Sequence, residues 1–324
     1  MNGLRFVLVA LGFLFWVALH LCAAVWALRK LGTNRAGEID LDYTRVENYH
    51  AREIREGRLN PGFEYAPFSR DSRGPAFRVL VSRGDCLVPS GTSVGAVVCW
   101  GPLTLQDGVA VTMYADSGGE MILGKDATIG GRATSSTAIR LERSSRVRSL
   151  AAPEITTARN RSAAILHLPE APPVTIPMSD GVDAGRHGLA PARLVQIGSD
   201  TWTYKGDLWL DAPLILRAKL IVFGSVRLAP HSILEEDLKA TAEIRIGAAS
   251  ICRGKLISDR NIELGPGARF ERVIYCAGEL RLGNGVRGEG PESVVAYAAG
   301  RLLLEDDVLV RGKLASGREV VCLP

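Results

Sequence analysis

Apolar residues return at a nearly fixed interval through the later part of the chain, from residue 206 to residue 324. Successive repeats start 18, 18, 18, 18 and 22 residues apart, at Gly206, Gly224, Ala242, Arg260, Gly278 and Gly300. The residue two places after each start is apolar: Leu208, Val226, Ile244, Ile262, Leu280 and Leu302. A period of this length is typical of a solenoid, in which each repeat buries its apolar face against the next one.

Within each repeat the apolar residues form pairs two residues apart, and each pair starts six residues after the previous one. One repeat carries Leu208 and Leu210, then Leu214 and Leu216, then Leu220 and Val222. A spacing of two is the period of a β-strand, so both members of a pair face one side while the residue between them faces the other. Gly, Asn and Pro between the pairs favour turns. The pattern predicts an all-β, triangular β-helix solenoid.

The same pattern starts earlier in the chain, near residue 78. Its repeats begin 17, 18 and 18 residues apart, at Gly84, Gly101, Gly119 and Thr137. Residues 155–205 interrupt it with five prolines, and a structureless segment of that length is typically an inserted functional loop or a linker. We expect about ten turns in two parts, residues 78–154 and 206–324. One continuous rod is favoured over two rods joined by the insertion.

The amino-terminal region predicts a membrane anchor. From Phe6 through Trp16 to Leu28 the chain has no Asp, Glu, Lys or Arg, and this run of 23 residues is long enough as a helix to cross a hydrocarbon layer of ~30 Å. A cleavable signal peptide has a shorter apolar core, so residues 1–30 are interpreted as a single uncleaved transmembrane helix in a lipid bilayer. Residues 31–77, rich in both charge signs, are interpreted as a juxtamembrane stalk.

The orientation of this anchor is deduced from charges and cysteines. Arg29, Lys30 and Arg35 follow the span whereas only Arg5 precedes it, which favours a cytoplasmic solenoid; the alternative is a periplasmic one. The five cysteines beyond the span are an odd number without Cys-x-x-Cys spacing. They are interpreted as small buried hydrophobes in a reducing compartment, not as disulfides or metal ligands.

Enzymatic motifs in the chain are weak. Gly283-x-Gly285-x-x-Gly288 matches a dinucleotide fingerprint, which requires a strand–turn–helix context, but here it lies at repeat corners. We therefore predict no catalytic residue, no cofactor and no metal. The net charge of +4 is slight for 324 residues, and no nucleic-acid partner is expected.

Two other functional classes stay open. A β-helix that binds or modifies envelope carbohydrate through the 155–205 insertion is the main alternative. A hexapeptide-type acyltransferase is the third, because such enzymes also build triangular coils with a period of six. That chemistry needs a histidine as general base, for which the chain offers His231 in the coil and His167 and His187 in the insertion.

Four arginines lie within nine residues of one another on the last turn before the insertion. Outward and corner positions of one turn would present them as a basic strip to an anionic polymer or lipid, although a plain solvated face explains them as well. This strip consists of Arg140, Arg143, Arg146 and Arg148.

Two turns carry a family resemblance, at residues 262–271 (IELGPGARFE) and 308–317 (VLVRGKLASG). They resemble turns of the bactofilins, the polymer-forming bacterial cytoskeletal proteins. The resemblance implies a right-handed β-helix that assembles end to end without nucleotide. It also implies a non-enzymatic scaffold at the bacterial inner membrane that organises cell-shape partners, envelope-synthesis proteins or peptidoglycan. The membrane span and the insertion depart from the family pattern.

Self-association is also expected on physical grounds. The end of a solenoid exposes unpaired strand edges and apolar core, which natural rods either cap or pair with another copy. We expect the last turn to end the coil without a capping helix and to form the interface of a homo-oligomer or filament. The residues of this putative end are Leu302, Leu304, Val308, Val310 and Leu314.

Overall fold

The computed structural model describes residues 79–158, 174–176 and 193–324, all within a compact unit that spans Thr44–Pro324. This part of the chain is a β-solenoid of about 12 turns, so the predicted all-β solenoid is confirmed, with more turns than the ten expected. Among the described residues no helix is long and apolar enough to span a membrane. The expected anchor (Phe6, Trp16, Leu28), the stalk and most of the insertion lie outside the described residues.

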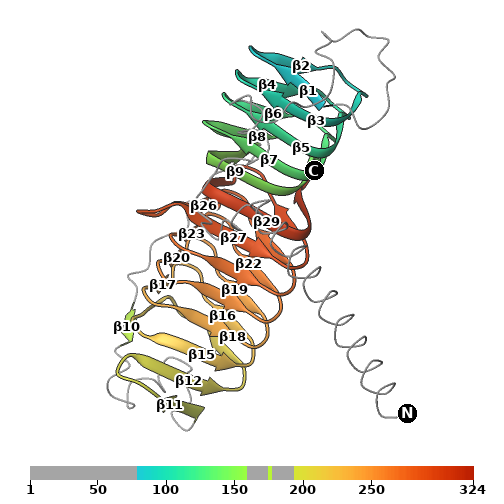
Figure 1. Ribbon diagram of the computed structural model, residues 1–324. Helices are drawn as coiled ribbons and strands as arrows, with labels where there is room; N and C mark the ends of the chain where they lie inside the picture. Colours follow the sequence, from blue (N-terminus) through green and yellow to red (C-terminus); the bar gives the residue numbers. More distant parts are fainter. Residues whose placement is uncertain (1–78, 159–173, 177–192) are drawn as a thin grey trace, which may run out of the picture. The chain divides into compact units, whose positions relative to one another are not determined.

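The first coil comprises residues 79–157 (Figure 1). Its strands are β1 (Val79–Ser82), β2 (Cys86–Val88), β3 (Ser93–Cys99), β4 (Leu103–Leu105), β5 (Ala110–Ser117), β6 (Met121–Leu123), β7 (Thr128–Ser135), β8 (Ala138–Leu141) and β9 (Arg146–Thr157). The longer strands β3, β5, β7 and β9 bend around a corner and so contribute to two faces of the coil.

The second coil comprises residues 201–322, preceded by the short strands β10 (Val174–Ile176) and β11 (Leu194–Gln196). Its earlier strands are β12 (Thr201–Lys205), β13 (Leu208–Leu210), β14 (Leu214–Leu216), β15 (Lys219–Phe223), β16 (Val226–Leu228), β17 (Ile233–Leu234), β18 (Leu238–Ala240), β19 (Ile244–Ile246) and β20 (Ile251–Cys252). The later ones are β21 (Leu256–Ser258), β22 (Ile262–Leu264), β23 (Arg269–Phe270), β24 (Ile274–Cys276), β25 (Leu280–Leu282), β26 (Arg287–Gly288), β27 (Val294–Ala298), β28 (Leu302–Leu304) and β29 (Leu309–Cys322).

Each strand of a coil pairs in parallel with the equivalent strand of the next turn. In the second coil Leu208 pairs with Val226, and Val226 pairs with Ile244, which reproduces the 18-residue period of the sequence. The step of 22 residues is also observed, because Leu280 pairs with Leu302. The extra residues of that step lie between β26 and β27, because Arg269 pairs with Arg287 whereas Ile274 pairs with Ala296.

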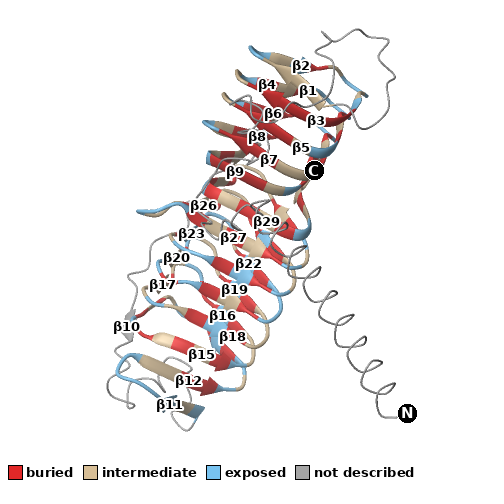
Figure 2. Cartoon of the chain, viewed as in Figure 1, coloured by how far each residue is buried: buried red, intermediate tan, exposed pale blue. Residues whose placement is uncertain are grey.

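The period-two pattern decides which side chains form the core. Leu208 and Leu210 are buried, whereas Trp209 between them is 62% exposed. The same alternation recurs from turn to turn, so one hydrophobic core runs through both coils (Figure 2). Burial of these columns stabilises the fold by roughly 25 cal/mol per Å² of apolar surface removed from water.

The two coils meet through their carboxy-terminal turns. Strand β9, the last of the first coil, pairs antiparallel with β29, the last of the second coil, and we refer to this pairing as the junction. All three faces cross it: residues 155–156 pair with 309–310, residues 149–152 with 312–315, and residues 146–147 with 320–321. The coils share continuous faces at this junction but run in opposite directions, so the expected single continuous coil interrupted by the insertion is wrong.

This arrangement places the insertion between two distant positions. The turn ending near Glu154 stacks on the last turn of the chain, not on the turn that starts at Gly206. The polypeptide returns to the far end of the second coil, where β10 pairs with β14 and β11 pairs with β12. Antiparallel pairing lets three successive stretches of β9 match three stretches of β29 although the second coil is reversed.

Candidate functional site

The carboxy-terminal turn, which we expected to be an open end, lies inside the junction. Leu314 faces Leu150 and Val310 faces Ile155, and all four side chains are at most 1% exposed. The remaining residues of the putative end, Leu302, Leu304 and Val308, are buried as well. The premise that this turn presents an unpaired edge is therefore wrong, because β9 of the same chain occupies that edge.

Three hydrogen bonds at the rim of the junction connect polar groups of the two coils. The Thr157 hydroxyl donates to the Glu305 carbonyl at 2.8 Å and accepts from the Val308 N–H at 2.9 Å. At the opposite corner the Ser144 N–H donates to the Cys322 carbonyl at 2.9 Å. Buried backbone groups cost free energy unless they are hydrogen-bonded, so these contacts allow the core to continue from one coil into the other.

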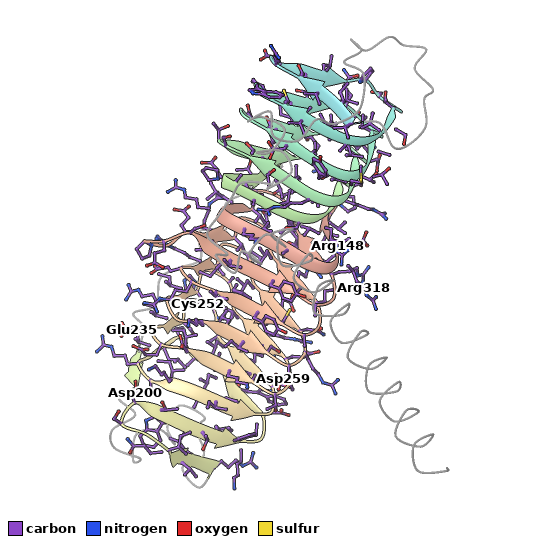
Figure 3. The ribbon with its side chains drawn as sticks, in the orientation of Figure 1. Arg148, Asp200, Glu235, Cys252, Asp259 and Arg318 are labelled. Atoms are coloured by element: carbon purple, nitrogen blue, oxygen red, sulfur yellow. The ribbon has the colours of Figure 1, made fainter. Side chains whose placement is uncertain are left out.

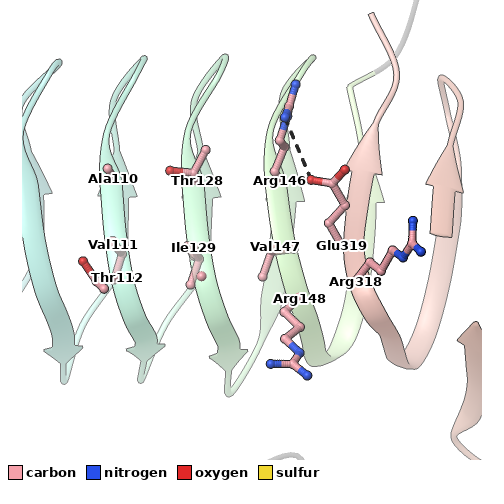
Figure 4. A pocket seen from close by; sticks show the side chains of 11 residues that line it. Ala110, Val111, Thr112, Thr128, Ile129, Arg146, Val147, Arg148, Arg318 and Glu319 are labelled. Carbon is pink, nitrogen blue, oxygen red and sulfur yellow. Dashed lines mark ion pairs between the residues drawn. The ribbon is translucent and has the colours of Figure 1, made fainter. Parts of the chain in front are cut away.

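A groove of about 410 Å³ opens beside the junction, on a corner of the solenoid (Figure 4). Strands β5, β7 and β9 contribute equivalent positions from successive turns, and β29 closes one side. The lining residues are Ala110, Val111, Thr112, Thr128, Ile129, Gly130, Arg146, Val147, Arg148, Arg318 and Glu319. Its charged residues come from both coils: Arg146 and Arg148 from the first, and Arg318 and Glu319 from the second.

The four arginines predicted as a basic strip occupy different parts of their turn. Arg140, on β8, pairs with Glu142 at 3.2 Å, and Arg143, at the following corner, pairs with Asp306 at 3.3 Å across the junction. Arg146 lies 3.9 Å from Glu319, also across the junction. Arg148 has no ion pair among the described residues, and only Arg146 and Arg148 line the groove.

Arg318 was missed by sequence reasoning. It lies on the irregular stretch of β29 where the register with β9 shifts between Ala315 and Val320. Figure 3 shows Arg148 and Arg318 on the same side of the solenoid although they come from different coils. The two positions are 170 residues apart in the sequence, and no repeat relates them.

The motifs that suggested enzymes have structural explanations in this fold. Gly288 lies in β26, where an added Cβ would collide with the buried ring of Phe270, so close packing explains this glycine. His231 is a corner residue with φ of 62° whose backbone N–H donates to the Ala248 carbonyl at 2.9 Å. The described residues contain no group of metal-binding side chains, and His167 and His187 lie outside them.

None of the described cysteines forms a disulfide. Burial raises the pKa of Cys252 to about 12 and that of Cys322 to about 12, because the thiolate is poorly solvated in the core. A hydrogen bond between the thiols of Cys86 and Cys99 raises the pKa of Cys86 as well. Protonated, buried thiols are weak nucleophiles and weak metal ligands, so they act as packing groups here.

Comparisons with known proteins give no match for this chain. Neither the family models, nor the curated proteins, nor the solved structures contain a significant relative.

Proposed function

We propose that the chain is a membrane-anchored, non-enzymatic scaffold that self-associates through the amino-terminal end of the first coil. The observation that supports this proposal most directly is the edge formed by β1 and β2. Among the described residues β1 pairs only with β3, and β2 pairs only with β4. Unpaired strand edges are templates for pairing with another chain.

The other end of the solenoid is better protected. Strand β11 pairs antiparallel with β12, and β10 pairs with β14, so two of its three faces carry an additional strand. Such added strands are a common way to cap a solenoid and prevent growth. With the junction closed internally, the β1–β2 edge is the favoured surface for contact between copies.

The side chains of this edge also suit an interface. Leu87, in the middle of β2, is 56% exposed, and Val79 and Val81 of β1 are only partly buried. In β2 the Cys86 N–H and the Val88 carbonyl bond to the next turn, at Pro102 and Gln106. Alternation along the strand directs the N–H of Leu87 toward the free edge.

Electron microscopy of the full chain in detergent tests this proposal. Without nucleotide or metal, rods joined end to end are expected to lengthen as the protein concentration rises. Leu87→Pro removes an edge N–H without removing a bond to β4, and it is expected to give single rods. Leu87→Thr keeps the N–H and serves as the matched control, with joined rods retained.

Two results would contradict the proposal. Monodisperse rods of the native chain at all concentrations would show that it does not self-associate. Equal assembly by Leu87→Pro would show that the interface does not involve the β1–β2 edge. Circular dichroism melting curves of both variants verify that the solenoid remains folded.

The bactofilin-like role and the inner-membrane location extend this proposal. The repeat style of the coils and the apolar run Phe6–Leu28 support them. Protease treatment of spheroplasts tests the orientation: a cytoplasmic solenoid stays intact until the membrane is opened with detergent. Digestion in intact spheroplasts would instead place the solenoid in the periplasm.

A further inference from the structure

The outer side of one face of the first coil is buried. Strands β3, β5, β7 and β9 lie side by side there, and one outward column of this face comprises Val98, Asp116, Thr134 and Ala151. These four residues are at most 2% exposed, and Val98 forms the centre of a small apolar cluster separate from the main core. Outward side chains of a sheet face water unless another layer packs on them.

The same face of the second coil shows how exposed these positions are without a covering layer. Across the junction Ala151 pairs with Lys313, and Lys313 pairs with Val295, and both partners are only partly buried. Tyr275 is 43% exposed although its ring stacks on that of Tyr297, with centroids 5.4 Å apart. Neighbours on the same face therefore do not bury outward side chains by themselves. A further part of the chain covers the first coil.

We propose that residues 44–59, which precede β1, are the segment that covers this face. Residues 44–78 belong to the same compact unit as the coils and lead directly into Val79, the first residue of the face. The residues between 59 and 79 span up to about 65 Å when extended. The five strands β1, β3, β5, β7 and β9 occupy only roughly 20 Å at a spacing of ~4.8 Å, so the segment can reach every part of the face.

The insertion is less suited to this position, because both of its parts are tied to the second coil. Residues 159–173 lead from the junction to β10, which pairs with β14. Residues 177–192 connect β10 to β11, which pairs with β12 of the same coil. These connections draw the insertion away from the first coil, whereas the segment before β1 starts on it.

The covered face contains a carboxylate that needs a positive charge. Asp116 is 2% exposed, and the Thr134 hydroxyl donates a hydrogen bond to it. Burial of an ionised carboxylate costs free energy unless the charge is paired and hydrogen-bonded. Burial also raises the pKa of Tyr114 on the same face, and the nearby Asp116 carboxylate is a second cause. The covering segment is therefore expected to bring a cation to Asp116.

The sequence of residues 44–59 supplies both apolar side chains and cations. Val46, Tyr49 and Ile54 fall within one face of a helix, which matches the apolar cluster around Val98. Arginine is well suited to a buried ion pair because its guanidinium is always charged and binds a carboxylate with two donors. The arginines of this segment are Arg45, Arg52, Arg55 and Arg58.

This contact leaves the proposed self-association edge open. Side chains stand roughly perpendicular to a sheet, whereas the backbone N–H and C=O groups point along its plane. A segment on the outer side of β3, β5, β7 and β9 therefore does not occupy the edge of β1 and β2. The docking of residues 44–59 is thus independent of contact between copies.

Photo-crosslinking of the full chain in detergent tests which segment covers the face. The crosslinker p-benzoylphenylalanine replaces Tyr114, and mass spectrometry identifies the peptide that it captures. Residues 44–59 are expected, in a product of monomer mass on a denaturing gel. Capture of residues 159–192 would assign the cover to the insertion, and a product of dimer mass would assign it to a second copy. Either result, or the absence of any crosslink, overturns the proposal.

Tyr275 is the matched control for this experiment. It lies on the same face of the solenoid, in the column that continues from Tyr114 across the junction, but in the second coil. The crosslinker at position 275 is expected not to capture residues 44–59. Equal capture from both positions would show that the segment has no preferred place on the face. Circular dichroism melting curves verify that both proteins are folded.

A double-mutant cycle tests the charge of the contact. Each of the four arginines is replaced by Gln in the native chain and in the Asp116→Asn background. One replacement is expected to lower the melting temperature of the native chain by roughly 6–10 °C, as for a broken buried ion pair, and to have little effect in the Asp116→Asn background. Arg227→Gln, at an exposed position of β16, is the control and is expected to change neither. If none of the four arginines couples to Asp116, the assignment of residues 44–59 is wrong.

Discussion

Leu150 of β9 and Leu314 of β29 face each other in antiparallel register, and both side chains are fully buried. They come from coils that run in opposite directions, yet they occupy the same interior column of the solenoid. The core therefore passes through a reversal of chain direction without a break in packing.

Leu314→Asp tests whether packing at the junction contributes to the stability of the fold. A carboxylate at this position would be buried opposite Leu150 without a partner, so the free energy of unfolding is expected to fall by more than about 3 kcal/mol. Urea denaturation measures the change. Leu303→Asp, at an outward position of β28, is the control and is expected to cost less than about 1 kcal/mol. Equal costs in both variants would contradict the interior position of Leu314.

Thr157→Val tests the polar rim of the junction. The substitution preserves shape but leaves the Val308 N–H without the hydroxyl oxygen that it contacts at 2.9 Å. The expected cost is about 1–3 kcal/mol, measured by urea denaturation. Thr156→Val, at the neighbouring outward position, is expected to change stability by less than about 0.5 kcal/mol. The prediction fails if the two variants are equally stable.

Gly288→Ala tests the packing explanation for the dinucleotide-like glycines. The new methyl group would enter the space of the Phe270 ring, at an expected cost of about 1–3 kcal/mol. In the Phe270→Leu background the same substitution is expected to cost less, because the smaller side chain leaves room. A double-mutant cycle by urea denaturation measures the coupling. Additive effects would show that the two residues do not compete for space.

The buried thiols predict a loss of stability at high pH. An unfolded thiol has a pKa of about 8.5, whereas burial raises the pKa of Cys252 to about 12 and that of Cys276 to about 11. As the pH rises from about 9, the unfolded chain loses protons that the folded chain keeps, so the free energy of unfolding falls. Below pH 8 these thiols are protonated in both states and contribute no pH dependence.

Cys252→Ala isolates this effect from other titrating groups. Its unfolding free energy is expected to decline less steeply between pH 8 and pH 10 than that of the native chain. Identical slopes would mean that Cys252 is accessible to solvent in the folded state.

Periodicity in the sequence predicts the faces of the solenoid but not the order of its turns. Leu208 and Leu302 occupy equivalent columns, so the pattern alone does not indicate which turn follows the insertion. A reversed coil presents the same apolar columns as a parallel one, because strand alternation has no direction. The 18-residue register was therefore predictable, whereas the antiparallel pairing of β9 with β29 was not.

The groove was only partly predictable for a related reason. Arg146 and Arg148 stand at outward positions of β9 on either side of the buried Val147, which the alternation indicates. Arg318 lies where β29 departs from regular pairing, and its distance from Arg148 depends on the junction. Because no local pattern encodes contacts between the two coils, sequence reasoning grouped Arg148 with its neighbours in the chain.

The junction also sets an order of events during synthesis. At a translation rate of about 5–20 residues per second, β9 leaves the ribosome roughly 10–30 s before β29 is complete. During that interval the nascent first coil has finished its own turns but lacks the strand that later covers them. Unpaired edges attract other strands, so the edge of β9 needs protection from other chains throughout that interval. The edge of β9 is covered only after β29 has been synthesised.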